Sequence, residues 1–256
     1  MQLLIKQSRW TMLLFAALLL TSCAAHANDE IVVSAAASLT NPLTEIQAAF
    51  EADHPSVKVV FNFGGSGTLR KQIEQGAEVD LFLFASEKDY QALVEGNMVG
   101  LGGPLLLNRL VIITSESSGI AVWPEFLEQN RMLAIGTPEA VPAGTYAKVA
   151  LERMGIWERL QDRIVYTKDV RQVLTLVKND AVQAGIVYAS DTAGEDQIMV
   201  LETVNPELHT PIRYFAGLTH HHAERAEAFY KYIWSEAALE IFRRHGFDTI
   251  FSDTGR

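Results

Sequence analysis

The chain has 256 residues, one cysteine, a formal net charge of −10 and 48% hydrophobic residues. Such an excess of acidic residues makes nucleic acid and anionic membrane surfaces poor partners. A single cysteine excludes an intrachain disulfide framework. The length exceeds the roughly 150 residues of a common domain. Because the sequence has no Pro/Ser/Gly-rich linker and no repeat, we expect two closely packed lobes.

The N-terminal segment has the three parts of a secretory leader. Lys6 and Arg9 precede the apolar run 12–20, and an Ala-His-Ala triplet ends at Ala27. Cleavage there removes 27 of 256 residues and leaves 229, with no cysteine. The net charge of −10 becomes −12, because the leader carries two basic residues and no acidic one. We therefore predict a periplasmic protein; the alternative is a form anchored by lipid on Cys23, since "LTSC" also fits a lipid-attachment site.

Strand-like and helix-like segments then alternate along the chain. Short apolar runs predict strands at 31–33, 56–63, 79–86, 109–116, 131–138, 163–167, 184–190 and 211–219. Amphipathic segments predict helices at 41–51, 68–76, 87–97, 145–155, 171–180 and 224–246. The alternation favours an α/β fold with parallel sheet. In the last helix, apolar residues at helical spacing should pack in the core: Ala226, Phe229, Tyr230, Ile233 and Trp234.

Three glycines surround Ser66 between a predicted strand and a predicted helix, in "GGSGT" at 64–68. A P-loop would need Lys-Ser/Thr after its last glycine, and a dinucleotide fingerprint would need glycine where Arg70 stands. This segment differs from the G-x-S-x-G elbow of serine hydrolases only in having Thr68, and not glycine, at the last position. A hydrolase using Ser66 therefore stays open as an alternative, although the late histidines lie in polar segments that suggest no partner.

Small residues also precede other predicted helices, at Ser38, at 143–145 and at Asp169. The first turn of a helix has N–H groups without partners, and glycines let a ligand approach them. If several such helix starts converge, they form a cavity for an anion. The alternative is that each serine, threonine or aspartate only caps its own helix.

Three adjacent histidines at 220–222 are a possible metal motif. Neighbouring side chains on a strand or helix cannot all face one ion, and metal sites usually space their ligands apart. We expect this triplet to be exposed to solvent.

Five segments are distinctive when taken together: "AAASLTNPLTEI", "FGGSGTLRKQIEQGAEVDLFLFAS", "PEAVPAGTYAKVALERMGIW", "DVRQVLTLVKNDAVQAGIVYASDT" and "AALEIFRRHGF". Together they resemble the periplasmic molybdate-binding proteins of bacterial ABC importers. The resemblance implies a two-lobed type II periplasmic binding protein fold with a hinge and a central ligand cleft. Lobe one would be 28–109 plus 216–256 and lobe two 110–215, with crossings near Arg109 and Phe215.

The resemblance also implies a non-enzymatic carrier of molybdate or tungstate that needs no cofactor and no bare metal-ion site. It would act as a monomer with the membrane permease of an ABC transporter. The anion would be held by Ser38, Ser66, Ala143, Val170 and Tyr188. Relatives often have a serine-rich run where this chain has glycines at 64, 65 and 67. None of the five contacts is basic, so neutral dipoles must hold the charge, and another tetrahedral oxyanion such as sulfate is the alternative ligand.

Overall fold

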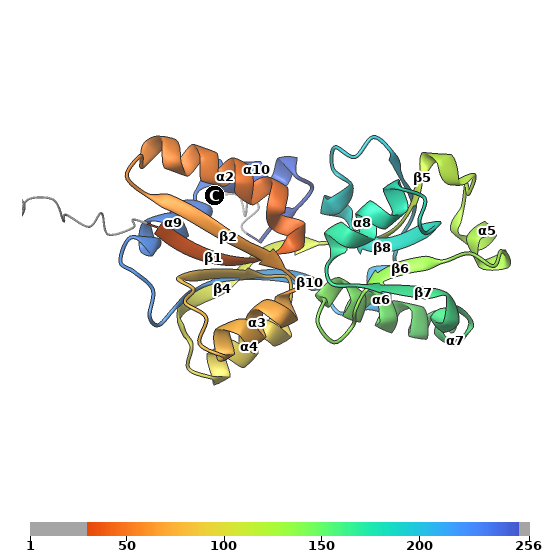
Figure 1. The fold of residues 1–256 in the computed structure, drawn as a ribbon, viewed down its shortest axis with the longest axis horizontal. Helices are drawn as coiled ribbons and strands as arrows, with labels where there is room; N and C mark the ends of the chain where they lie inside the picture. Colours follow the sequence, from red (N-terminus) through yellow and green to blue (C-terminus); the bar gives the residue numbers. More distant parts are fainter. Residues whose placement is uncertain (1–29, 251–256) are drawn as a thin grey trace, which may run out of the picture.

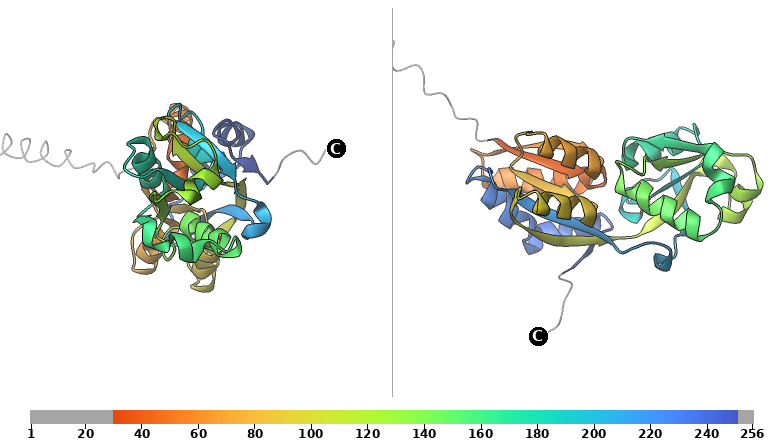
Figure 2. Two further views of the ribbon diagram at one scale, coloured as in Figure 1. Left: turned by 90° about the vertical axis from the view of Figure 1, so that its right-hand side faces the viewer. Right: turned by 90° about the horizontal axis from the view of Figure 1, so that it is seen from below.

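The computed structural model describes residues 30–250, so the predicted leader and Cys23 lie outside the described residues. Figure 1 shows two α/β lobes side by side, one made from the two ends of the described chain and one from its middle. Two extended segments join the lobes, and both run along the same side of the molecule in Figure 2. Within residues 30–250 no helix is long and apolar enough to cross a membrane. The two lobes, each an α/β sheet with helices, confirm the predicted two-lobed α/β architecture.

The lobe containing the described chain ends is built on a six-stranded sheet. Its order in space is β11 (Asp248–Thr249), β4 (Val99–Asn108), β10 (Ile212–Thr219), β3 (Leu81–Phe84), β1 (Glu30–Ala36) and β2 (Lys58–Gly64). β1 is parallel to β2 and β3, whereas β10 is antiparallel to β3 and β4. Helices cover both faces of this sheet (Figure 1): α2 (Thr40–Asp53), α9 (Ala226–Ile233) and α10 (Glu236–Arg244) on one, α3 (Ser66–Glu74) and α4 (Glu87–Glu95) on the other.

The middle lobe is built on a five-stranded sheet. Its order is β7 (Ile164–Thr167), β6 (Leu133–Gly136), β8 (Ala184–Tyr188), β5 (Leu110–Ser115) and β9 (Ile198–Thr203). β6 is parallel to β7 and β8, and β5 is antiparallel to β8 and β9. Helices α6 (Pro142–Arg153) and α8 (Val170–Lys178) lie on opposite faces, while α5 (Trp123–Glu128) and α7 (Trp157–Leu160) lie at the end far from the other lobe (Figure 1).

The chain passes between the sheets twice. On the first passage only Arg109 separates the end of β4 from the start of β5. The return runs from the end of β9 at Thr203 to the start of β10 at Ile212 and includes a short helix, η6 (Pro206–Leu208). All of β10, including Phe215, pairs within the six-stranded sheet.

Both sheets are mixed, whereas the alternation of elements predicted parallel pairing. β10 is antiparallel to β3 because it enters the sheet from the other lobe. It starts at the end of the sheet where the parallel strands finish, and so runs in the opposite direction. β4 went unpredicted because Gly100, Gly102, Gly103 and Pro104 lower its strand propensity. One of these glycines meets a packing need, since a Cβ on Gly102 would lie 2.8 Å from the carbonyl oxygen of Ala216.

The predicted C-terminal helix 224–246 is two helices, α9 and α10. The break falls at Ser235, whose Oγ accepts a hydrogen bond from the Ala238 amide at 3.4 Å and so starts α10 as an N-cap. The apolar stripe is buried as predicted at four of its five positions, Ala226, Phe229, Tyr230 and Ile233, while Trp234 is partly exposed.

The segment around Ser66 shows how local sequence positions the cleft. β2 ends at Gly64, Gly65 is extended, and α3 begins at Ser66. The helix ends before Gly76, whose φ of +91° is a conformation that favours glycine. Leu69 and Ile73 anchor α3 to the sheet, because both are buried with Phe82 and Phe84. The N-terminal turn of α3 therefore faces the middle lobe.

Candidate functional site

The five residues predicted from the resemblance line one small cavity between the lobes. Ser38, in the short helix η2 (Ala37–Leu39), and Ser66 come from the six-stranded lobe. Ala143, Val170 and Tyr188 come from the five-stranded lobe. The cavity volume is about 10 Å³, close to the minimum for one water molecule. The fold thus brings together residues that are up to 150 positions apart, Ser38 and Tyr188 being the extremes.

Helices from both lobes begin at this cavity. Ser66 is the first residue of α3, Ala143 the second of α6 and Val170 the first of α8. Amides in these positions have no carbonyl partner within their own helix, and the helix dipole makes them favourable to an anion. The capping alternative holds for α8, where Asp169 Oδ1 accepts from the Gln172 amide at 2.9 Å. It does not hold for α3 or α6, which have no side-chain cap.

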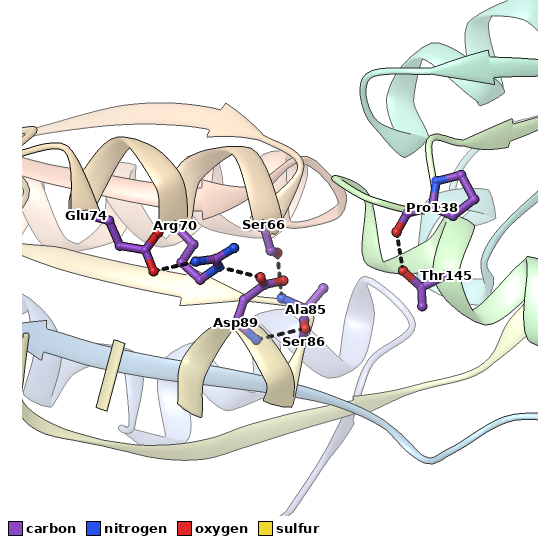
Figure 3. A network of polar contacts seen from close by, with 8 residues as sticks. All are labelled: Ser66, Arg70, Glu74, Ala85, Ser86, Asp89, Pro138 and Thr145. Atoms are coloured by element: carbon purple, nitrogen blue, oxygen red, sulfur yellow. Dashed lines mark hydrogen bonds and ion pairs between the residues drawn. The ribbon is translucent and has the colours of Figure 1, made fainter. Parts of the chain in front are cut away.

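The Ser66 hydroxyl is fully buried and oriented by the backbone. Its Oγ accepts a hydrogen bond from the Ala85 amide at 3.0 Å, as Figure 3 shows. A hydroxyl has two acceptor positions and one donor proton. Because the amide occupies an acceptor position, the proton of Ser66 remains for an acceptor in the cavity.

The Ser38 hydroxyl is held by residues on the two strands that lead to the other lobe. Its Oγ lies 2.9 Å from Tyr214 Oη, and Asn108 Nδ2 donates to the same Tyr214 oxygen at 3.3 Å. Asn108 Nδ2 also donates to Ser190 Oγ of the other lobe at 2.8 Å. Burial raises the pKa of Tyr214 well above its ordinary value, so the phenol keeps its proton. When Tyr214 donates to Ser38, the Ser38 proton is directed to the cavity.

Tyr188 ends β8 and supplies a further hydroxyl. Its side chain is 1% exposed, and its Oη has no hydrogen-bond partner among the described residues. Its ring lies edge-on to Tyr214, with centroids 5.7 Å apart. Burial raises the pKa of Tyr188 well above its ordinary value, so the group is a proton donor at neutral pH. A buried donor without an acceptor costs about 1 to 3 kcal/mol, and an anion in the cavity would relieve that cost.

The cavity contains no basic side chain among the described residues that line it. The nearby Arg70, on α3, donates from Nε to Asp89 Oδ1 at 2.9 Å and pairs with Glu74. Figure 3 shows this guanidinium between the two carboxylates, away from the Ser66 hydroxyl. The one carboxylate among the lining residues, Asp169, accepts a hydrogen bond from a backbone amide of α8 and caps that helix. The polar groups left for a ligand are therefore hydroxyls and amides, and such donors suit an anion that carries no proton.

The buried carboxyl group of Asp191 lies next to the Tyr188 backbone. Asp191 is 2% exposed; its Oδ2 accepts from the Tyr188 amide at 3.0 Å, and its Oδ1 has no partner among the described residues. Burial raises the pKa of Asp191 to about 7, against the opposing effects of the Tyr188 amide and Arg171. Asp169 and Glu195 raise this pKa further.

We expect Asp191→Asn to remove a pH dependence of stability. The folded chain keeps the Asp191 proton up to about pH 7, whereas an unfolded aspartate loses it near its ordinary value of about 3.9. The stability from this proton is therefore complete below about pH 4 and is lost as the pH rises toward 7, by up to about 1.4 kcal/mol per pH unit. Urea unfolding of both proteins between pH 5 and pH 8 measures the difference. A variant with the same pH slope as the wild type would show that Asp191 titrates normally.

The sequence did not indicate Tyr214, Asn108 or Asp191, because each acts through contacts distant in the chain or through burial. For Tyr214, the available signal in the sequence was a hydroxyl-bearing residue inside a mostly apolar strand. The histidine triplet is not part of the site. His220 and His221 are exposed in a turn, and His222 Nδ1 contacts the Thr219 carbonyl oxygen.

Comparisons with known proteins agree with this architecture. A family model described as bacterial extracellular solute-binding protein matches residues 31–248. The molybdate-binding protein ModA of Escherichia coli is 37% identical over 229 residues, which cover 85% of this chain and 88% of that one. A Bacillus subtilis protein named as an ABC transporter substrate-binding lipoprotein, YvgL, is 36% identical over 222 residues and 85% of each chain. The solved periplasmic molybdate-binding protein of Azotobacter vinelandii superposes with a TM-score of 0.76 at 24% identity, covering 85% of this chain and 98% of that one.

Two α/β lobes with a small cavity between them have the architecture of a two-lobed solute-binding protein. The chain belongs to the bacterial extracellular solute-binding protein family. Its relatives include a molybdate-binding protein and a protein named as an ABC transporter substrate-binding lipoprotein, so the chain is a binding protein and not an enzyme. The hydrolase alternative is therefore wrong, and Ser66 accordingly pairs with a backbone amide.

Proposed function

We propose that the chain captures molybdate or tungstate between its lobes. The observation that carries the proposal is one small cavity with donors from both lobes and no basic residue. In this reading the hydroxyls of Ser38, Ser66 and Tyr188 donate to the oxyanion, and backbone amides at Ser38, Ser66, Ala143 and Val170 supply the other bonds. The 37% identity to a molybdate-binding protein supports the choice of ligand.

We propose that lobe one (28–109 plus 216–256) and lobe two (110–215) move about a hinge where the chain passes between them. Because β10 pairs in the six-stranded sheet from Ile212 onward, the return passage lies before it, between Thr203 and Ile212. Only closure lets both sets of donors reach one anion, so ligand binding favours the closed form. We propose that the closed protein acts as a monomer in the periplasm and delivers its anion to the membrane permease of an ABC importer. Anchoring through Cys23 is the alternative, and the similarity to a lipoprotein supports it.

Sulfate is the second candidate ligand. The donors from both lobes are the observation in its favour, because they suit any tetrahedral anion that carries no proton. Sulfate has the same charge as molybdate and no proton, so size alone can distinguish the two.

We expect calorimetric titration to show binding of molybdate and tungstate, and much weaker binding of sulfate and phosphate. Near neutral pH phosphate usually keeps a proton, and the five proposed contact residues include no carboxylate to accept it, while the lining Asp169 is engaged as the cap of α8. An unmatched buried group costs about 1 to 3 kcal/mol, so phosphate should bind roughly 5 to 150 times more weakly for that reason alone. Sulfate, with its shorter bonds, should fail to reach donors on both lobes at once.

Competition decides between the two candidates. Tungstate should displace molybdate at a comparable concentration, because the two anions nearly match in size. Displacement by sulfate at a comparable concentration would instead identify a sulfate carrier. Binding of phosphate as tight as molybdate would contradict the donor-only description of the site.

A further inference from the structure

Two glycines beside Ser66 make a direct backbone contact between the lobes. The Gly67 amide, in α3, donates to the carbonyl oxygen of Ala140 at 3.1 Å. Ala140 belongs to the loop between β6 and α6 of the other lobe. The main chain at the start of α3 therefore touches the main chain of the opposite lobe at the edge of the cavity.

This contact leaves no room for a side chain at either glycine. A Cβ on Gly65 would lie 2.7 Å from the Ala140 carbonyl oxygen and 3.1 Å from that of Lys168. A Cβ on Gly67 would lie 3.0 Å from the Ala140 oxygen and 3.2 Å from its Cα. Ordinary contact begins at 3.4 Å, and these neighbours are backbone atoms that cannot rotate away. A methyl group at either position requires the backbone of the opposite lobe to move away.

The glycines are needed for space and not for backbone conformation. Gly65 has φ −68° and ψ 132°, which any residue adopts. Gly67 lies inside α3, where alanine is the better helix former by about 1 kcal/mol. Neither has a positive φ. Alanine therefore fits the fold of the six-stranded lobe at both positions and conflicts only with the approach of the other lobe.

We infer that Gly65 and Gly67 set how closely the lobes approach, and thereby which size of oxyanion the cavity holds. Ser66 lies between them on one lobe, while the Ala140 loop leads directly into α6, which carries Ala143 on the other. The separation of these donors follows from the glycine contact. The choice of anions in this inference rests on the proposed function.

Alanine variants with a matched control test the inference. Gly64 is the control: it lines the same cavity, but a Cβ there meets only the Leu69 side chain, at 3.4 Å within its own lobe, and nothing of the other lobe. We expect Gly65→Ala and Gly67→Ala to weaken molybdate binding at least about tenfold, the loss when one hydrogen bond to a charged acceptor is not made. Sulfate should lose more than molybdate, because a smaller anion needs closer lobes. Gly64→Ala should stay within about twofold of the wild type.

A distance measurement without ligand tests the contact itself. Spin labels on cysteines introduced at the exposed Lys71 of α3 and Glu152 of α6 report the separation of the lobes by electron paramagnetic resonance. In Gly65→Ala and Gly67→Ala the distribution should shift to longer distances, while Gly64→Ala should match the wild type. Thermal melts of the label-free variants should remain cooperative and close to wild type, as the backbone geometry implies. Should Gly65→Ala alone fail to fold, Gly67→Ala carries the same comparison.

The outcomes separate the inference from the proposed function. If the wild type binds no oxyanion, the proposed function fails, and the ligand-free distances still decide whether the glycines control closure. If the wild type binds molybdate and the two glycine variants match it in affinity and in distance, the inference is overturned and the function stands. Equal losses in all three variants would also overturn it, because they would show a general effect of the loop.

Discussion

Molybdate at about a thousand times its dissociation constant is expected to raise the free energy of unfolding by about 4 kcal/mol. A ligand that binds only the folded, closed form stabilises it by mass action. In this protein the donors come from both lobes, at Ser38 and Ser66 on one and Ala143, Val170 and Tyr188 on the other, so an unfolded chain cannot assemble them. For a chain of this size the gain corresponds to a rise in melting temperature of roughly 8 to 16 °C.

Differential scanning calorimetry at several molybdate concentrations measures this rise. Sodium chloride at equal ionic strength is the control, because screening alone acts on the excess negative charge of the chain. The melting temperature should climb with the logarithm of molybdate concentration above the dissociation constant. An unchanged melting temperature in millimolar molybdate would contradict the proposed ligand.

Ser38→Ala is expected to weaken molybdate binding roughly 10- to 150-fold and to lower the stability of the ligand-free chain by about 1 to 3 kcal/mol. The substitution removes one hydroxyl donor to a charged acceptor, worth about 1.5 to 3 kcal/mol. The loss of stability arises because the buried Tyr214 hydroxyl keeps its hydrogen bond from Asn108 but loses Ser38 as the acceptor of its own proton. Titration calorimetry measures the affinity, and a urea melt of the ligand-free protein measures the stability.

Ser66→Ala should weaken binding by a similar factor and also destabilise the chain. It leaves the buried Ala85 amide without its acceptor, at a cost of about 1 to 3 kcal/mol. Ser86→Ala is the matched control: Ser86 is buried nearby and caps α4 through the Asp89 amide at 3.1 Å, yet it does not line the small cavity. That variant should lose about 1 kcal/mol of stability and keep its affinity. Unchanged affinity in both Ser38→Ala and Ser66→Ala would remove the proposed site.

The fold was predictable where its pattern is local. Apolar periodicity located most strands and helices, and Gly76 marked the end of α3, because such signals depend on neighbours within one or two turns. The periodic pattern missed β4, whose glycines and proline lower its strand propensity; of these residues, Gly102 is explained by the close approach of β10. It merged α9 and α10, because one apolar stripe continues across the break at Ser235. Strand direction was mispredicted where the chain returns from the other lobe.

The sequence by itself determined where helices begin beside small residues, and its resemblance to a known family picked out the five residues that line the cavity. Only the tertiary structure decided how their hydroxyls are oriented and how close the lobes come. Ser38 is aligned by Tyr214, 176 positions away, and the glycines at 65 and 67 are constrained by Ala140 in the other lobe. A local pattern records the conformation of its own segment, whereas a hydrogen-bond direction or a steric limit depends on where a distant segment packs. The sequence therefore indicates which residues supply the donors, whereas the distance between the donors is set by how the two lobes pack.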